Sequence, residues 1–226
     1  MFQNLLNLFF PQICEACKTP LSDNEKVICV DCRHDLPITN FHYQADDAIK
    51  KILYGRVQLE NATALLHFSK KGLVQELLHN LKYRGHEHIG EFLGKWLGSE
   101  LKDLENYKII DVVVPVPIHK NKLRERGYNQ VTKFGVAIAE ILNAEYRESA
   151  LLKIEKSKTQ ALKDRLTRLD DAEKQFATGD FKGLDNKHIL LVDDIITTGA
   201  TVEACIELLN TIPGVRVSLA AMAVTE

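Results

Sequence analysis

The chain has 226 residues, of which 45% are hydrophobic and 27% are charged, and its formal net charge is -2. This balance fits a soluble protein with one main core and excludes the strongly basic surface that marks a general nucleic-acid binder. The apolar run at residues 5–10 ends at Pro11 and lacks a basic leader, so we expect a short docking helix in a cytoplasmic protein, with no signal peptide or membrane span. No Walker-type G-x-x-x-x-G-K-[ST], G-x-G-x-x-G or G-x-S-x-G string occurs, which disfavours the enzyme classes that carry them.

Four of the five cysteines lie near the N-terminus, as Cys14-x-x-Cys17 and Cys29-x-x-Cys32. Each C-x-x-C loop lets two thiolates converge on one ion, and two loops complete the tetrahedral set that Zn²⁺ prefers. Two disulfides would need an oxidising compartment, and a redox pair would not need duplication. We therefore predict a zinc knuckle, whose metal is structural because four thiolates leave no position open for a catalytic water.

After the knuckle, apolar residues recur first at helical spacing and then in continuous runs. In chain order, the predicted elements are a helix around 49–54, a strand at 64–68, helices at 72–83 and 89–104, a strand at 109–116, a helix at 129–142, strands at 151–154 and 189–192, a helix at 200–209 and a strand at 215–224. Strands that alternate with helices of this length predict an α/β fold, with a mostly parallel sheet flanked by helices. We expect three parts: the N-terminal helix and knuckle at 1–40, a connection at 41–60, and the main domain at 61–226.

The stretch ILLVDDIITTGAT, residues 189–201, predicts a ligand site. A buried carboxylate needs a partner, so the aliphatic run must deliver Asp193 and Asp194 to an edge where their charge is compensated. Ligands of open parallel sheets bind beyond the carboxyl ends of the strands, where the next helix begins. The turn that follows supplies backbone N–H groups and hydroxyls for a phosphate from Thr197, Thr198, Gly199, Ala200 and Thr201. A ribose 5-phosphate fits this order of groups, while a plain strand end with a helix cap would use the same residues without a ligand.

VDDIITTGAT closely resembles the phosphoribosyl pyrophosphate binding motif of type I phosphoribosyltransferases. Together with the four-cysteine front end, LKYRG at 81–85 and VPVPIHKNKLRERGYNQ at 114–130, it resembles the competence-protein ComF family, often called ComFC or GntX. The similarity covers nearly the whole chain, and the ordered combination is more specific than any single motif. It implies a type I phosphoribosyltransferase-like sheet behind a small zinc knuckle.

The resemblance also implies roles for individual residues. Asp193 and Asp194 would hold the ribose hydroxyls, and the loop 197–201 would hold the 5-phosphate. The strand that ends near Val116 and Pro117 would lead into a pyrophosphate loop. The basic residues that would neutralise the diphosphate, together with Mg²⁺, are His119, Lys120, Arg124 and Arg126.

A second basic stretch, residues 153–168, carries six bases against two acids. In the ComF family this region begins with a T-Q pair, matched here by Thr159 and Gln160, and contains an R-x-x-N pattern. Here Arg168 is followed by Leu-Asp-Asp, so Asp171 stands where the family has asparagine. The stretch fits a loop that closes over phosphates, and it equally fits a solvated charged face.

Two classes of function follow from the resemblance. A phosphoribosyltransferase must stabilise a departing pyrophosphate and keep water out, but no segment matches a purine or pyrimidine recognition hood, so the acceptor stays open. Alternatively, the fold is a non-catalytic single-stranded DNA-binding component of the DNA uptake machinery, with other competence proteins such as a DNA helicase as partners. Residues 119–133 carry five bases against one acid, and Tyr128 beside them offers a stacking surface.

Overall fold

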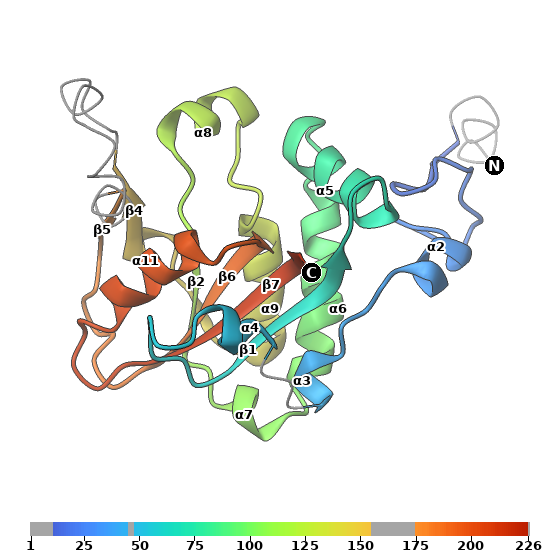
Figure 1. Cartoon of the computed structure of the whole chain (residues 1–226). Helices are drawn as coiled ribbons and strands as arrows, with labels where there is room; N and C mark the ends of the chain where they lie inside the picture. Colours follow the sequence, from blue (N-terminus) through green and yellow to red (C-terminus); the bar gives the residue numbers. More distant parts are fainter. Residues whose placement is uncertain (1–10, 45–47, 155–174, 226) are drawn as a thin grey trace.

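The computed structural model describes residues 11–44, 48–154 and 175–225. At its centre is a five-stranded parallel sheet in the order β1-β7-β6-β2-β3 (Figure 1). The strands are β1 Ala62–Phe68, β2 Val112–Pro115, β3 Glu145–Tyr146, β6 His188–Ile196 and β7 Arg216–Thr225. The prediction of an α/β fold with a mostly parallel sheet is confirmed. The predicted docking helix at residues 5–10 lies outside the described residues.

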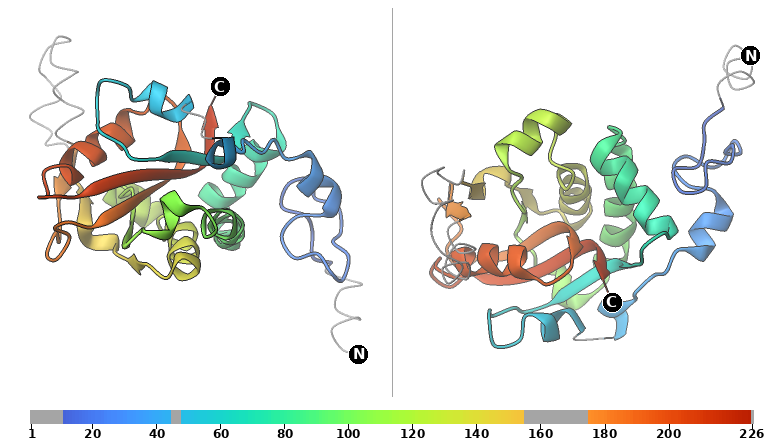
Figure 2. Two further views of the ribbon diagram at one scale, coloured as in Figure 1. Left: turned by 90° about the horizontal axis from the view of Figure 1, so that it is seen from below. Right: turned by 45° about the horizontal axis from the view of Figure 1, so that its top comes forward.

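Helices cover both faces of the sheet, as seen from below in Figure 2. On one face lie α5 Leu73–Tyr83, α6 His88–Leu101 and α9 Thr132–Leu142, and on the other lie α4 Ala48–Ile52 and α11 Ala200–Leu209. Side chains of β6 alternate between the two: Leu190 and Val192 join the first hydrophobic cluster, and Ile189 and Leu191 join the second. This alternation explains the continuous apolar runs in the sequence, because a strand covered on both faces needs an apolar residue at every position.

Some elements differ from the prediction. The basic segment after β2 was expected as a loop and forms helix α8, Lys120–Arg126. The ring Nδ1 of His119 accepts the N–H of Asn121 at its start, and Gly127 ends it in the left-handed conformation with φ 85°. None of its residues is buried, so no apolar periodicity marked it as a helix.

The strand predicted at residues 151–154 is present but lies outside the main sheet. It forms β4, Leu151–Lys153, which pairs antiparallel with β5, Phe176–Thr178, after the short 3-10 turn Glu148–Ala150. Its middle residue, Leu152, is half exposed, so the strand is covered on one side only. The short helices α2 Val30–Asp35, α3 Phe41–Gln44 and α7 Glu105–Lys108 were not anticipated from the sequence.

The four-cysteine segment lies to one side of the sheet, next to α5 (Figures 1 and 2). Its Ala16 and Ile28 belong to the same hydrophobic cluster as Leu77 and Leu81 of α5. The segment is therefore packed onto the main domain. Across the described residues, no helix is both long enough and apolar enough to cross a bilayer.

Helices α6 and α9 approach closely through glycines of α6. A Cβ atom on Gly94 would lie 2.5 Å from the carbonyl oxygen of Phe134 and 3.0 Å from the Cβ of Ala137. The backbone of α9 cannot yield as a flexible side chain could. Gly94 therefore sets the distance between two helices that support the sheet.

We expect Gly94→Ala to lower the free energy of unfolding by about 1–3 kcal/mol, because overpacking against a backbone carbonyl outweighs the better helix propensity of alanine. Urea denaturation measures the change. Gly90→Ala is the matched control on the same helix, since its Cβ would meet its neighbours at an ordinary 3.5 Å. Equal stability of the two variants would contradict the interpretation.

Candidate functional site

A cavity of about 500 Å³ opens at the carboxyl ends of β2 and β6. Its walls come from the end of α5, the segment after β2, α8, β4, the end of β6 and the start of α11. The lining residues are Lys82, Tyr83, Val116, Pro117, Ile118, His119, Lys122, Arg126, Gln130, Lys153, Asp193, Asp194, Ile195, Thr197 and Thr201. Segments far apart in the sequence thus meet at the sheet edge where ligands of parallel α/β folds bind.

The paired acids lie within β6, which continues to Ile196 and pairs with β7 beyond them. Both are buried and both line the cavity. The Oδ2 atom of Asp194 accepts a hydrogen bond of 2.8 Å from the Nε2 of Gln130 and lies 2.8 Å from the Nζ of Lys82. The Oδ1 atom of Asp193 accepts only a backbone N–H among the hydrogen bonds of the described residues, that of Asp194 at 2.8 Å. Among the described residues, Asp194 therefore forms an ion pair with a cation, and Asp193 forms none.

The environment of Asp193 shifts its pKa. Burial, followed by the neighbouring charge of Asp194, raises the pKa of Asp193 to about 8. The backbone N–H and the cations Lys82 and Lys153 oppose the rise without cancelling it. In the protein alone, Asp193 therefore holds a proton at pH values where an exposed aspartate has lost it.

The turn after the acids is held from outside the cavity. Gly199 adopts the left-handed conformation with φ 79°, and a Cβ there would lie 2.7 Å from the Cδ2 of Leu53. Arg56 braces the turn: its Nη2 donates to the carbonyl oxygens of Thr198, at 3.1 Å, and of Ile52, and its Nη1 lies 2.6 Å from Glu203. Thr197 and Thr201 line the cavity, whereas Thr198, Gly199 and Ala200 shape the turn.

The predicted basic residues divide into two groups. His119 and Arg126 line the cavity, as does Pro117, while Lys120 and Arg124 are exposed on α8 and lie outside the lining. The Nη1 of Arg126 donates to Gln130 at 2.7 Å, and its guanidinium lies 5.1 Å from the centre of the Tyr83 ring.

The lining residues that were not singled out as site residues from the sequence include Lys82, Lys122, Gln130 and Lys153. Lys82 and Gln130 lie inside the LKYRG and VPVPIHKNKLRERGYNQ segments, which were the available signal. The Nζ of Lys153 lies over the ring of Phe176, 4.7 Å from its centre, and burial lowers the pKa of this lysine. The predicted features Thr159–Gln160 and Arg168–Asp171 lie outside the described residues.

The four predicted metal ligands come together. The sulfur atoms of Cys14, Cys17, Cys29 and Cys32 all lie within 4.8 Å of one another, and those of Cys17 and Cys29 are 3.6 Å apart. Sulfur atoms of a tetrahedral zinc site stand roughly 3.8 Å apart, whereas a disulfide would need about 2.05 Å. Backbone N–H groups of Cys29 and Cys32 point to the sulfurs of Cys14 and Cys29, each at 3.4 Å. The group has the geometry of a four-thiolate metal site.

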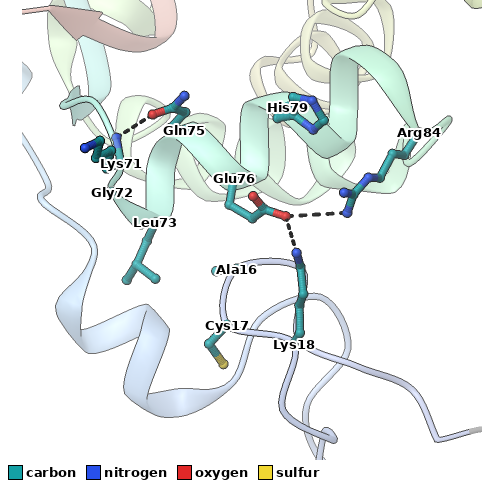
Figure 3. A pocket seen from close by; sticks show the side chains of 10 residues that line it. All are labelled: Ala16, Cys17, Lys18, Lys71, Gly72, Leu73, Gln75, Glu76, His79 and Arg84. Atoms are coloured by element: carbon teal, nitrogen blue, oxygen red, sulfur yellow. Dashed lines mark hydrogen bonds and ion pairs between the residues drawn. The ribbon is translucent and has the colours of Figure 1, made fainter.

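A second cavity, of about 480 Å³, lies between the four-cysteine segment and α5 (Figure 3). Its single carboxylate, Glu76, is already shared between Lys18, at 2.7 Å, and Arg84, at 3.5 Å. It lacks both a paired acid and a small-residue turn. The cavity at the end of β6 is therefore the candidate functional site.

Residues 127–223 match the phosphoribosyl transferase domain. The matched region contains Asp193, Asp194 and the turn to α11. This part of the chain is therefore similar to the phosphoribosyl transferase domain.

Relatives extend the match beyond this domain. The DNA utilization protein YhgH of Escherichia coli is 22% identical over 89% of this chain and 92% of its own length. The competence protein ComFC of Streptococcus pneumoniae is 28% identical over 63% of this chain and 60% of its own length. The resemblance to the ComF family is therefore confirmed. Among solved structures, the glutamine phosphoribosylpyrophosphate amidotransferase of B. subtilis is 17% identical with a TM-score of 0.42, over 62% of this chain and 30% of that one.

We expect Asp193→Asn to stabilise the ligand-free protein at pH 8 by several kcal/mol, up to roughly 5 kcal/mol. The pKa of this carboxyl is 3.8 in the unfolded chain and about 8 in the folded protein. The free energy of unfolding of the wild type therefore falls as the pH rises from 3.8 toward 8, because the folded state holds the proton more tightly. The gain over the wild type should therefore grow across this window and be small at pH 4. Urea denaturation at several pH values measures it, with the exposed Asp185→Asn as control. A gain that does not depend on pH would contradict the assignment.

Proposed function

We propose that the chain binds phosphoribosyl pyrophosphate with Mg²⁺ in the cavity at the end of β6. The observation that carries this proposal is the pair of buried acids, Asp193 and Asp194, placed directly before a left-handed glycine turn at the same cavity. Acceptors for sugar hydroxyls and donors for a phosphate then stand in the order that a ribose 5-phosphate presents them. The phosphoribosyl transferase domain match supports the same choice of ligand.

The acids are assigned to the ribose hydroxyls. In the protein alone, the Oδ2 of Asp194 is engaged by Lys82 and Gln130, which therefore stand beside the position proposed for the sugar. Asp193 can accept a hydroxyl because its only protein hydrogen bond among the described residues comes from a backbone N–H. A bound Mg²⁺ would add positive charge near this pair, which would favour the ionised form of Asp193.

The phosphates are assigned to opposite ends of the cavity. The turn at 197–201 would hold the 5-phosphate with its N–H groups and the hydroxyls of Thr197 and Thr201. His119, Lys122 and Arg126, on the segment after β2, would face the diphosphate. A bound Mg²⁺ would neutralise part of the diphosphate charge. The protein cations would stabilise the further negative charge that builds up on the leaving group.

A transfer reaction at this site would release pyrophosphate from an oxocarbenium-like centre, and it would require an acceptor in place of water. Incubation with phosphoribosyl pyrophosphate and mixtures of bases, nucleotides and single-stranded DNA, followed by measurement of released pyrophosphate, identifies that acceptor. We also propose that the chain works in the cytoplasm in natural competence and the use of transforming DNA. The names of its relatives, a competence protein and a DNA utilization protein, support this role.

We further propose that the four cysteines hold one structural zinc ion. Their sulfur distances fit a tetrahedral set, and the described cysteines are all free of disulfides. The metal would replace a core that so short a segment cannot build from side chains alone. We also propose that the chain has three parts, which are the N-terminal helix and zinc knuckle at 1–40, a connection at 41–60 and the phosphoribosyltransferase-like domain at 61–226.

We expect phosphoribosyl pyrophosphate with Mg²⁺, at a hundredfold excess over its dissociation constant, to stabilise the protein by about 2.7 kcal/mol. Asp193→Asn combined with Asp194→Asn should abolish the thermal shift, because both sugar contacts are lost. A full shift in this double variant, or none in the wild type, would refute the site.

Two lysines of α8 give a matched pair for the same measurement. Lys122 lines the cavity and Lys120 does not, although both are exposed and both lose the same charge on substitution by methionine. Lys122→Met should weaken the affinity about tenfold, and Lys120→Met less than about twofold. Equal effects would point to general electrostatic attraction.

Metal analysis of the purified protein, after brief treatment with a weak chelator, should find about one tightly held zinc per chain. Cys14→Ser with Cys17→Ser should lose this ion and lower the melting temperature, whereas Cys205→Ser should keep it, because Cys205 lies in the core of α11. A folded wild-type protein without zinc would refute the assignment.

A further inference from the structure

Three side chains meet where the four-cysteine segment joins the main domain. Glu15 lies inside the Cys14–Cys17 loop, and His86 and His88 lie at the connection between α5 and α6. The Oε2 of Glu15 is 2.7 Å from the Nδ1 of His86, and its Oε1 is 2.8 Å from the Nε2 of His88. One ligand atom from each residue lies within 4.8 Å of the other two. None of the three has a role in the proposed binding of phosphoribosyl pyrophosphate.

From this geometry we propose that Glu15, His86 and His88 form a second metal site, which takes a divalent transition-metal ion such as Zn²⁺ or Co²⁺. Two imidazoles and one carboxylate are a donor set that these ions accept, and three protein ligands leave a fourth position open. Mg²⁺ and Ca²⁺ are disfavoured because they prefer oxygen ligands throughout.

The charge at the cluster supports a cation. The Glu15 side chain is only 10% exposed, and among the described residues no lysine or arginine forms an ion pair with it. Asn80 orients it, since its Nδ2 donates to the Glu15 backbone oxygen at 2.8 Å and to Oε2 at 3.2 Å. A buried carboxylate without a permanent cation is costly, and a divalent ion would compensate it.

The positions of the ligand atoms require only a small adjustment. Donors around a tetrahedral Zn²⁺ stand roughly 3.4 Å apart, given metal–ligand bonds of about 2.0–2.1 Å, so the two contacts must open by roughly 0.6–0.7 Å. The imidazoles can move, because the His86 and His88 side chains are 37% and 49% exposed. The same exposure gives an ion a path from solvent. An ion here would join the knuckle to the main domain through ligands from both.

Uptake of Co²⁺ by the full chain tests the proposal, by equilibrium dialysis after the weak-chelator step. The wild type should bind one equivalent more than Glu15→Gln, with visible absorption and no added thiolate charge-transfer band, because the ligands are nitrogen and oxygen. His86→Ala and His88→Ala should each weaken this equivalent at least tenfold. His34→Ala, an exposed histidine beside the knuckle, is the matched control and should bind as the wild type does.

Each contrary result overturns the proposal. If Co²⁺ uptake by the wild type equals that of Glu15→Gln, the cluster is only a hydrogen-bonded contact between the two parts. If the extra equivalent persists in both histidine variants, the ion binds elsewhere. Glu15→Gln keeps the size of the side chain, and a cooperative melt of each variant verifies that it is folded. The result is independent of phosphoribosyl pyrophosphate, which is absent from the experiment.

Discussion

Strand β6 is hydrogen-bonded to β2 on one side and to β7 on the other, and helices cover both of its faces. No residue from Ile189 to Val192 can reach water, so each must be apolar. After this apolar stretch, polar side chains follow where β2 has ended and the cavity opens. The acids at 193 and 194 stand at this point, and the position of the candidate site follows from the burial of the strand that leads to it.

The alternation of strand side chains also separates the two acids. Asp194 continues the series of Leu190 and Val192, on the face covered by α5 and α9, where it meets Lys82 and Gln130. Asp193 continues the series of Ile189 and Leu191, on the face of α11, and it forms no ion pair among the described residues. The raised pKa of Asp193 follows from this placement, because the buried carboxyl lies beside Asp194 and has no ion pair within the described part of the chain. The difference between the two acids arises because strand side chains alternate between the two faces of the sheet, and because α5, on the face of Asp194, carries the cation.

The contiguous part of the candidate site could be predicted from the sequence. Of the assembled part, the family resemblance pointed to Pro117, His119 and Arg126, but not to Lys82 or Lys153. The acids, the turn and α11 lie in one short run, so their order along the chain is also their order in space. Lys82 and Lys153 reach the cavity from α5 and β4, and their approach depends on how these elements pack, which no local pattern encodes. Helix α8 was missed for a related reason: all of its residues remain accessible, so the apolar spacing that reveals other helices is absent.

Arg56 links the candidate phosphate turn to the segment that precedes β1. Its guanidinium spans the carbonyl oxygens of Ile52 and Thr198, and Leu53 fills the space that a side chain at Gly199 would need. Residues of the connecting segment thus contact the turn that would hold the phosphate and fix its shape on one side. A fragment that begins at residue 61 would retain every residue assigned to the proposed ligand but would lack Leu53 and Arg56. The smallest unit that keeps the turn in this shape therefore begins before β1.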